Sequence, residues 1–241
     1  MDYRTSHLQK GKDYDAALSK GNFDTYMTQR EQKILSSVMT GVFPEKIPRY
    51  LDFACGTGRI TSLVENFAVV SYGVDLSEQM MEQARQKCKR TDFILKDITK
   101  NNLEIEPVNL ITAFRFFGNA QDELRRVVFQ SLSKLLVNGG FLILNNHRNP
   151  YSLLKMLEKL TGGKDPVDLS YYKLKKYLAD AGFKIARVYG IGFWMIHHRL
   201  NTSRLINSQL VKIIEPISLI PGLSPFCPDS VIVAQKIGDG D

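Results

Sequence analysis

The residues best suited to bind a ligand lie between positions 50 and 61, in the sequence Tyr-Leu-Asp-Phe-Ala-Cys-Gly-Thr-Gly-Arg-Ile-Thr. A short apolar strand here leads into a glycine turn and then into the start of a predicted helix. Gly56 and Gly58 lack a Cβ, so the backbone can turn tightly and approach a ligand closely. The free N–H groups at the start of a helix attract anionic groups. The pattern predicts a negatively charged or hydroxyl-rich ligand at this turn.

Thr61 sets the turn apart from that of dinucleotide-binding proteins. Those proteins carry Gly or Ala at the corresponding position, where a small residue lets the helix and strand pack closely under a pyrophosphate. A threonine at position 61 therefore argues against NAD or FAD as the ligand.

Acidic residues end two further apolar stretches that read as strands. Residues 68–75 form the first, and it ends at Asp75, 17 residues beyond Gly58. A carboxylate about 20 residues after such a turn can accept both hydroxyls of a ribose. Residues 91–99 repeat the pattern with Asp97. This carboxylate could simply cap its own loop, but its phase with the other strand ends favours a place at the same ligand.

Three motifs in this region resemble those of class I S-adenosylmethionine-dependent methyltransferases. Leu-Asp-Phe-Ala-Cys-Gly-Thr-Gly, from residue 51, is similar to the first motif of that family, and Gly-Val-Asp-Leu-Ser-Glu-Gln-Met-Met, from residue 73, is similar to the second. Leu-Leu-Val-Asn-Gly-Gly-Phe-Leu-Ile-Leu, from residue 135, also fits the family pattern. Ala54 departs from it, because the family usually has its first glycine there. The resemblance covers about residues 48–146.

The resemblance implies that the ligand is S-adenosylmethionine, with the adenosine held by side chains at the strand ends. It implies that Asp75 accepts the ribose hydroxyls and that Leu76 and Met80 flank the adenine. Asp97 and the backbone N–H of residue 98 would meet the polar edge of the base, which must be satisfied when the base is buried. The implied cofactor-binding residues are Tyr14, Asp52, Ala54, Gly56, Gly58, Asp75, Leu76, Met80, Asp97, Ile98 and Phe114. Tyr14 would lie near the methyl donor, with Tyr26 as the other candidate.

Strands that alternate with helices predict an α/β fold. Such a chain forms a doubly wound, mostly parallel sheet with helices on both faces, and its ligand lies beyond the carboxyl ends of the strands. The resemblance adds a helical N-terminal lid and an antiparallel last strand. Besides the strands named above, we expect helices at 24–40, 121–136 and 150–161, a helix capped by Asp168 or Ser170, and strands at 108–114, 141–145, 183–193 and 230–236, with a turn at 137–140.

One domain is expected to span residues 1–241. Within it, residues 1–45 would form the lid, residues 46–146 the cofactor-binding half and residues 147–241 the substrate-side half. An insert at 194–229 precedes the last strand, where the family usually has a short connection. At the active edge of the sheet, such an insert would build the substrate pocket.

Charge is distributed unevenly along the chain, whose formal net charge is +7. Residues 147–212 contain 12 Lys or Arg and 4 Asp or Glu, so the basic character lies in this segment. It could attract an acidic small molecule or an RNA backbone, or simply form the solvated face of a helix. No DNA partner is predicted, and the sequence gives no indication of oligomeric state.

The cysteine content and the apolar runs bear on where the protein works. Three widely spaced cysteines, Cys55, Cys88 and Cys227, suggest neither a disulfide framework nor a zinc site. We find no signal peptide and no stretch of eighteen uncharged apolar residues. These features predict a soluble, cytoplasmic protein with no membrane span.

Transfer of a methyl group from a sulfonium needs an aligned nucleophile, exclusion of water and, for a hydroxyl acceptor, removal of a proton. No metal is required. Phe114 and the aromatic residues that follow it could exclude water, while Arg115 and Asn119 could orient a substrate oxygen. The candidate bases are His147, His197 and His198, although loop histidines are more often merely solvated.

The sequence therefore predicts a methyltransferase that acts on a small molecule, at a hydroxyl oxygen of a glycan or natural-product-like acceptor. Two alternatives stay open. One is an RNA methyltransferase that uses the basic segment 147–212. The other is a non-catalytic protein of the same fold that uses the pocket to stabilise an interface.

Overall fold

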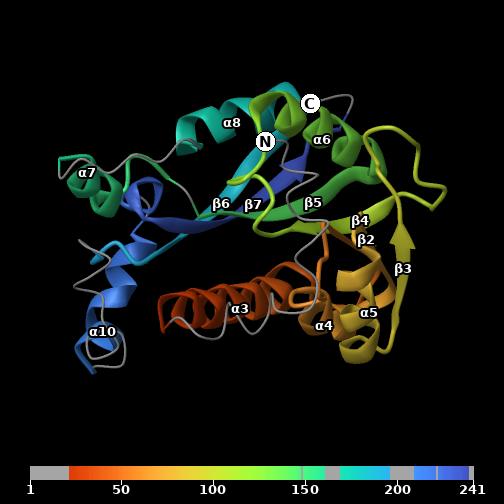
Figure 1. The fold of residues 1–241 in the computed structure, drawn as a ribbon, viewed down its shortest axis with the longest axis horizontal. Coiled ribbons are helices and arrows are strands. Elements are labelled where there is room, and N and C mark those ends of the chain that lie inside the picture. The colour runs from red at the N-terminus through yellow and green to blue at the C-terminus, as the bar shows by residue number, and fades with distance from the viewer. Residues whose placement is uncertain (1–21, 148, 161–168, 196–208, 221, 239–241) are drawn as a thin grey trace.

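The computed structural model describes residues 22–147, 149–160, 169–195, 209–220 and 222–238. The described residues form a central sheet with helices on both faces (Figure 1). Tyr14, His197 and His198 lie outside the described residues, and so do residues 1–21 of the predicted lid.

A seven-stranded sheet in the order β3-β2-β1-β4-β5-β7-β6 organises the fold. Strands β1 to β5 run parallel, and β7 is antiparallel to both β5 and β6. The strands are β1 (Ile47–Phe53), β2 (Ala68–Asp75), β3 (Thr91–Leu95), β4 (Val108–Ala113), β5 (Leu136–Asn146), β6 (Phe183–Ile191) and β7 (Asp229–Lys236). This confirms the predicted fold class. The chain reverses its winding direction between β1 and β4, where open α/β sheets bind their ligands.

Helices cover both faces of this sheet. The α-helices are α3 (Asn22–Val42), α4 (Thr61–Val64), α5 (Glu78–Lys87), α6 (Asp122–Leu135), α7 (Leu153–Leu160), α8 (Tyr171–Asp180) and α10 (Gln209–Ile214), and the 3₁₀ helices are η1 (Glu65–Phe67), η2 (Glu215–Leu219) and η3 (Ser224–Phe226). Figure 1 shows α6 and α8 on one face and α3, α4 and α5 on the other. Two helices begin at serines whose hydroxyls accept a backbone N–H three residues on, Ser77 for α5 and Ser170 for α8.

Two apolar clusters hold these layers together. On the α6 side, Phe117 and Phe129 stack with ring centroids 4.0 Å apart, and both are fully buried. On the other side, Leu35 and Met39 of α3 are fully buried in a cluster that includes Ile143 of β5. Helix α3 is therefore part of the core and not only a cover over a ligand.

Strands β3 and β5 have boundaries that differ most clearly from the expected ones, and β6 ends at Ile191, two residues before the expected end. Strand β3 ends at Leu95, so Asp97 lies in the loop that follows. Strand β5 begins at Leu136 and includes the residues predicted as a turn, with an irregularity in its pairing to β4 between Leu136 and Phe141. Gly139 adopts a φ of +77° within this irregular stretch, which a glycine tolerates without steric cost.

The insert between β6 and β7 packs against β6 at Gly190. A Cβ on this residue would lie 2.3 Å from the carbonyl oxygen of Ser218 in η2 and 2.4 Å from Sγ of Cys227. The glycine thus allows the insert to approach the sheet edge closely.

Substitution of Gly190 by alanine should destabilise the protein. Because the clashing atoms include a backbone carbonyl, we expect Gly190→Ala to lower the free energy of unfolding by about 2–3 kcal/mol. Gly41→Ala is the matched control, since nothing lies within 4 Å of the added Cβ, and it should stabilise α3 by about 0.5 kcal/mol. Urea unfolding of both variants measures this, and equal stabilities would contradict the packing described.

Candidate functional site

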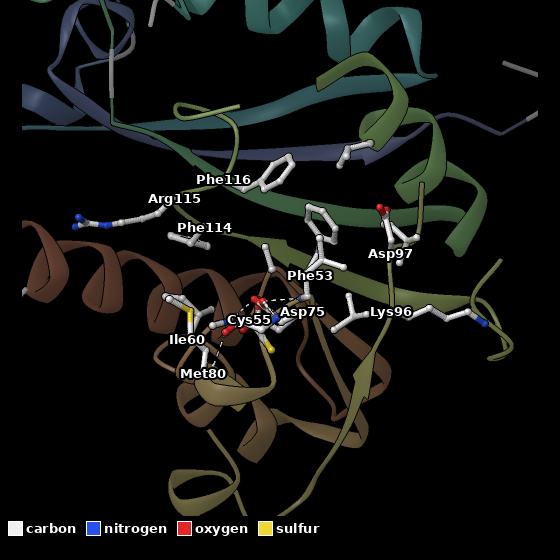
Figure 2. Close-up of a pocket in the computed structure, with 18 of the residues that line it drawn as sticks. Phe53, Cys55, Ile60, Asp75, Met80, Lys96, Asp97, Phe114, Arg115 and Phe116 are labelled. Carbon is white, nitrogen blue, oxygen red and sulfur yellow. Dashed lines mark hydrogen bonds between the residues drawn. The ribbon is translucent and has the colours of Figure 1, made fainter. Parts of the chain in front are cut away.

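A pocket of about 1080 Å³, including part of its open mouth, lies at the carboxyl ends of the parallel strands (Figure 2). Nine of the predicted cofactor residues line it: Asp52, Ala54, Gly56, Asp75, Leu76, Met80, Asp97, Ile98 and Phe114. These residues lie in or just after the carboxyl ends of four different strands, so the sheet brings together side chains that are far apart in sequence. The pocket agrees with the shared edge that the sequence predicted.

The glycine turn after β1 is held in a left-handed conformation. Gly56 has a φ of +54° and Gly58 a φ of +76°. A Cβ on Gly58 would lie 2.9 Å from the Cβ of Ala84 in α5. This glycine therefore packs the turn closely against α5, whereas Gly56 lines the pocket itself. Within one turn, Gly58 allows close packing against α5 and Gly56 allows close approach of a ligand.

Ala54 also has a positive φ, of +53°. This conformation is uncommon for a residue with a Cβ and costs energy that the surrounding structure must offset. The position is the one where the resembled family usually has glycine. The backbone here takes the conformation that glycine favours, even though the residue is alanine.

Asp75 connects this turn to β2 and α5. One carboxylate oxygen accepts the N–H groups of Leu76, at 2.7 Å, and Ser77, at 2.9 Å, and the other accepts the N–H of Gly56 at 2.8 Å. The second oxygen, Oδ2, has only this one protein donor among these bonds, so it can also accept from a ligand hydroxyl. Three backbone donors fix the orientation of a carboxylate that lines the pocket.

Asp97 caps its own loop and lines the pocket as well. Its Oδ1 accepts the backbone N–H of Thr99 at 2.9 Å and the Thr99 hydroxyl at 2.6 Å. The two interpretations of Asp97 made from the sequence are therefore compatible. Figure 2 shows Asp75 and Asp97 at separate points along the pocket, with the ring of Phe53 between them in that view.

Apolar side chains form the walls between these polar points. The rings of Phe53 and Phe116 meet edge to face, with centroids 4.8 Å apart. Met80 and Ile98 are buried and also line the pocket. Flat apolar walls with a few fixed polar groups suit a planar aromatic ligand whose edges carry hydrogen-bonding atoms.

Asp52 is a buried carboxylate beneath the turn, with 2% of its surface exposed. It accepts hydrogen bonds from the hydroxyls of Thr61, at 2.6 Å, and Thr112, at 2.7 Å. Burial raises the pKa of Asp52 to about 6, although both hydrogen bonds and the nearby Arg59 oppose this. The physical cause is the loss of water around the charged form.

A second polar group, which the sequence did not reveal, links α3 to the pocket. Glu31 of α3 is fully buried and accepts from Arg59 Nη1 at 2.8 Å and from Asn145 Nδ2 at 2.6 Å. The Oδ1 of Asn145 accepts the backbone N–H of Arg115 at 2.6 Å. Because Arg59 and Arg115 both line the pocket, this network connects the helix to the ligand site. Its members are 28 and 114 residues apart, and no local motif indicates them.

Asp229 lies at the start of β7 and interacts electrostatically with Glu31, Arg115 and Arg59. Only 2% of it is exposed. Burial and then the nearby Glu31 raise the pKa of Asp229 well above its ordinary value, while Arg115 and Arg59 oppose the rise. The sequence did not predict that Asp229 is buried near these charged groups, because there it only marks the end of the insert.

His147, a predicted base, lies just after β5. Its ring packs against the loop after β4, where a Cβ on Gly118 would lie 2.8 Å from Cε1 of the histidine. Phe116, two residues before Gly118, lines the pocket, whereas His147 is not among the lining residues. Among the described residues, no group of three or more His, Cys, Asp or Glu side chains is placed to hold a metal ion.

The fold and site together define a Rossmann-like α/β protein with a pocket at the switch point of its sheet. Residues 51–140 match the profile of a family described as a methyltransferase domain. Over 99 residues the chain is 35% identical to trans-aconitate 2-methyltransferase of Rhizobium rhizogenes, and the alignment covers 40% of this chain and 38% of that protein. The chain spans 38%, 54% and 62% of the lengths of three curated relatives.

Solved structures resemble most of the chain. Magnesium protoporphyrin IX methyltransferase of Synechocystis, with bound S-adenosylhomocysteine, superposes with a TM-score of 0.65 at 17% identity, and the match covers 97% of both chains. An S-adenosylmethionine-dependent methyltransferase of Thermotoga maritima gives a TM-score of 0.61 at 20% identity over 88% of this chain and 90% of that one. These likenesses show that the chain shares the fold of these methyltransferases, and the methyltransferase-domain profile matches residues 51–140 of it.

No described helix is both long enough and apolar enough to cross a membrane.

The buried Asp52 should make stability depend on pH. Its folded-state pKa of about 6 lies above the ordinary aspartate value of 3.8, so the folded protein holds this proton more tightly than the unfolded chain. Its contribution is fully present below about pH 4 and is lost as pH rises through about 6, for a total of about 3 kcal/mol. Asp52→Asn removes this dependence. Urea unfolding of both proteins from pH 4 to 8 measures the difference, and a difference that does not change with pH would contradict the assignment.

Proposed function

We propose that this protein is an S-adenosylmethionine-dependent methyltransferase that transfers a methyl group to a hydroxyl oxygen of a small-molecule acceptor. The observation that carries the proposal is one pocket lined by the glycine turn, Asp75 and Asp97. The methyltransferase domain match supports it, as does the bound S-adenosylhomocysteine of the Synechocystis neighbour. The printed names of that neighbour and of the Rhizobium relative include a porphyrin and an aconitate, which supports a small-molecule acceptor.

The cofactor would lie along the pocket with its adenosine between the two carboxylates. The ribose hydroxyls would donate to Asp75, whose orientation is fixed by three backbone N–H groups. The adenine would lie among Leu76, Met80 and Ile98, with its amino group toward Asp97. S-adenosylmethionine supplies an activated methyl group on its sulfonium, so the protein has to orient the acceptor and exclude water.

The acceptor would approach near the ends of β4 and β5. Phe114 and Phe116 are buried and line the pocket, so they can exclude water from the sulfonium. Arg115 lies between them with a φ of +59°, and a guanidinium there can orient an acceptor oxygen but cannot act as a base. His147 is the described candidate to take the acceptor proton, and His197 and His198 remain proposed alternatives.

Removal of the ribose acceptor should weaken cofactor binding. We expect the full chain to bind S-adenosylhomocysteine at micromolar concentrations by calorimetry. Asp75→Asn should bind about 10- to 100-fold more weakly, because it loses a charged hydrogen-bond acceptor. Glu82→Gln, at an exposed position of helix α5, which follows Asp75 in the chain, is the control and should bind as the wild type does. No binding by the wild type at high micromolar ligand would contradict the proposed function.

Asp97 should select the amino group of adenine. S-inosylhomocysteine carries a carbonyl in place of that amino group, so it should bind the wild type at least about tenfold more weakly than S-adenosylhomocysteine. In Asp97→Asn the side-chain amide can donate to that carbonyl, and the preference should shrink. If the variant kept the full wild-type preference, Asp97 would not contact the adenine edge.

A further inference from the structure

Exposed apolar side chains are concentrated in two short segments far from the glycine turn. Fourteen large apolar side chains are exposed among the described residues, and ten of them lie within 151–160 and 210–226. Scattered exposed apolar residues are normal on a protein surface, but a concentration of this kind marks an interaction site.

Helix α7 carries the first group as an outward-facing stripe. Leu153, Met156 and Leu160 are 37%, 51% and 83% exposed, and their spacing of three and four residues places them on one side of the helix. Leu154, by contrast, is 2% exposed and packs inward. The helix therefore has an apolar inner contact and a second apolar face that no described part of the chain covers.

Helix α10 and the following η2 repeat this arrangement. Leu210, Ile213 and Ile217 are 54%, 72% and 41% exposed at the same spacing of three and four residues. Val211 is 2% exposed and points to the core. A helix with apolar residues on both its inner and outer sides normally packs against something on each side.

The two segments are held at the same end of the molecule. Asn149, just before α7, donates from Nδ2 to the carbonyl oxygens of Pro225, at 2.6 Å, and Cys227, at 3.0 Å. These residues follow η2 in the same insert. Figure 1 shows α7 and α10 at the end of the view opposite β3. The described part of the insert and α7 thus form one region, which we call the α7–α10 end.

Charge at this end favours one kind of partner. Lys159 and Lys212 are exposed beside the apolar stripes, and Glu215 is 1% exposed, so its charge is withdrawn from the surface. In α7, α10 and η2 together there are three Lys and two Glu, and Lys155 pairs with Glu158 at 2.8 Å, so the exposed charge beside the stripes is positive. Aliphatic side chains flanked by lysines fit the interface of a bilayer that contains anionic lipids.

We propose that the α7–α10 end docks on the surface of an anionic lipid bilayer. The exposed leucine, isoleucine and methionine side chains insert at the boundary between headgroups and acyl chains, and the lysines contact the lipid phosphates. Helix α7 follows the carboxyl end of β5, at the edge of the sheet where the pocket opens. Docking would therefore place that edge of the sheet toward the membrane. The proposal does not rest on the proposed methyl transfer.

Co-sedimentation of the full chain with vesicles tests the proposal. We expect binding to phosphatidylcholine vesicles that contain 30% phosphatidylglycerol and little binding to phosphatidylcholine alone. Leu160→Ser combined with Ile213→Ser should weaken the binding at least about tenfold, because two apolar insertions are lost. Val69→Ser is the matched control, since Val69 is 61% exposed on β2, and it should bind as the wild type does.

Further variants separate the contributions and keep the result interpretable. The double variant Lys159→Gln, Lys212→Gln should reduce binding to anionic vesicles and make that binding less sensitive to salt. If the double serine variant does not fold, each single serine variant should have an intermediate effect on binding. The proposal is overturned if the wild type does not bind anionic vesicles, or if neither the serine nor the glutamine variants bind less. Dimerisation would also overturn it. That outcome is shown if analytical sedimentation detects a dimer that the serine variants break and that anionic vesicles do not dissociate. Titration with S-adenosylhomocysteine on the same samples tests the proposed function separately.

Discussion

The contact between the Asp75 carboxylate and the glycine turn holds the site together. One carboxylate at the end of β2 accepts the N–H of Gly56 from the turn after β1 and the N–H groups that begin the path into α5. Two neighbouring parallel strands are thereby joined at their carboxyl ends. Because the carboxylate also lines the pocket, the group that orders the turn is the group available to a ribose. Loss of this side chain would disturb both.

Strain and buried charge both occur around this contact. Ala54 and Arg115 are the non-glycine residues with positive φ among the described residues, and both line the pocket. Such backbone persists only where neighbours fix it. The buried Glu31 supplies part of that support, because it pairs with Arg59 and with the Asn145 side chain that accepts from the backbone of Arg115. Removal of Glu31 would leave buried polar groups without a partner, which is costly.

The sequence predicted those features that depend on local pattern. Strand β2 has the predicted bounds, and Ser170, one of the two expected caps, begins α8. The alternation of strands and helices in the sequence, with acidic residues at the strand ends, predicted the sheet and nine of the residues that line the pocket. The Glu31–Arg59–Asn145 network was missed because its members meet only through tertiary packing. The separate role of Gly58 follows from its distance to Ala84, which no spacing in the sequence encodes. The exposed stripes at 153–160 and 210–217 have ordinary helical periodicity, so only the fold reveals which face is left uncovered.

A crystal structure of the full chain with S-adenosylhomocysteine tests the central claim most directly. The account predicts the ribose hydroxyls within hydrogen-bonding distance of the Asp75 carboxylate and the adenine amino group at Asp97, with the base between the apolar walls of the same pocket. A ligand bound with its ribose away from Asp75, or outside this pocket, would contradict the account.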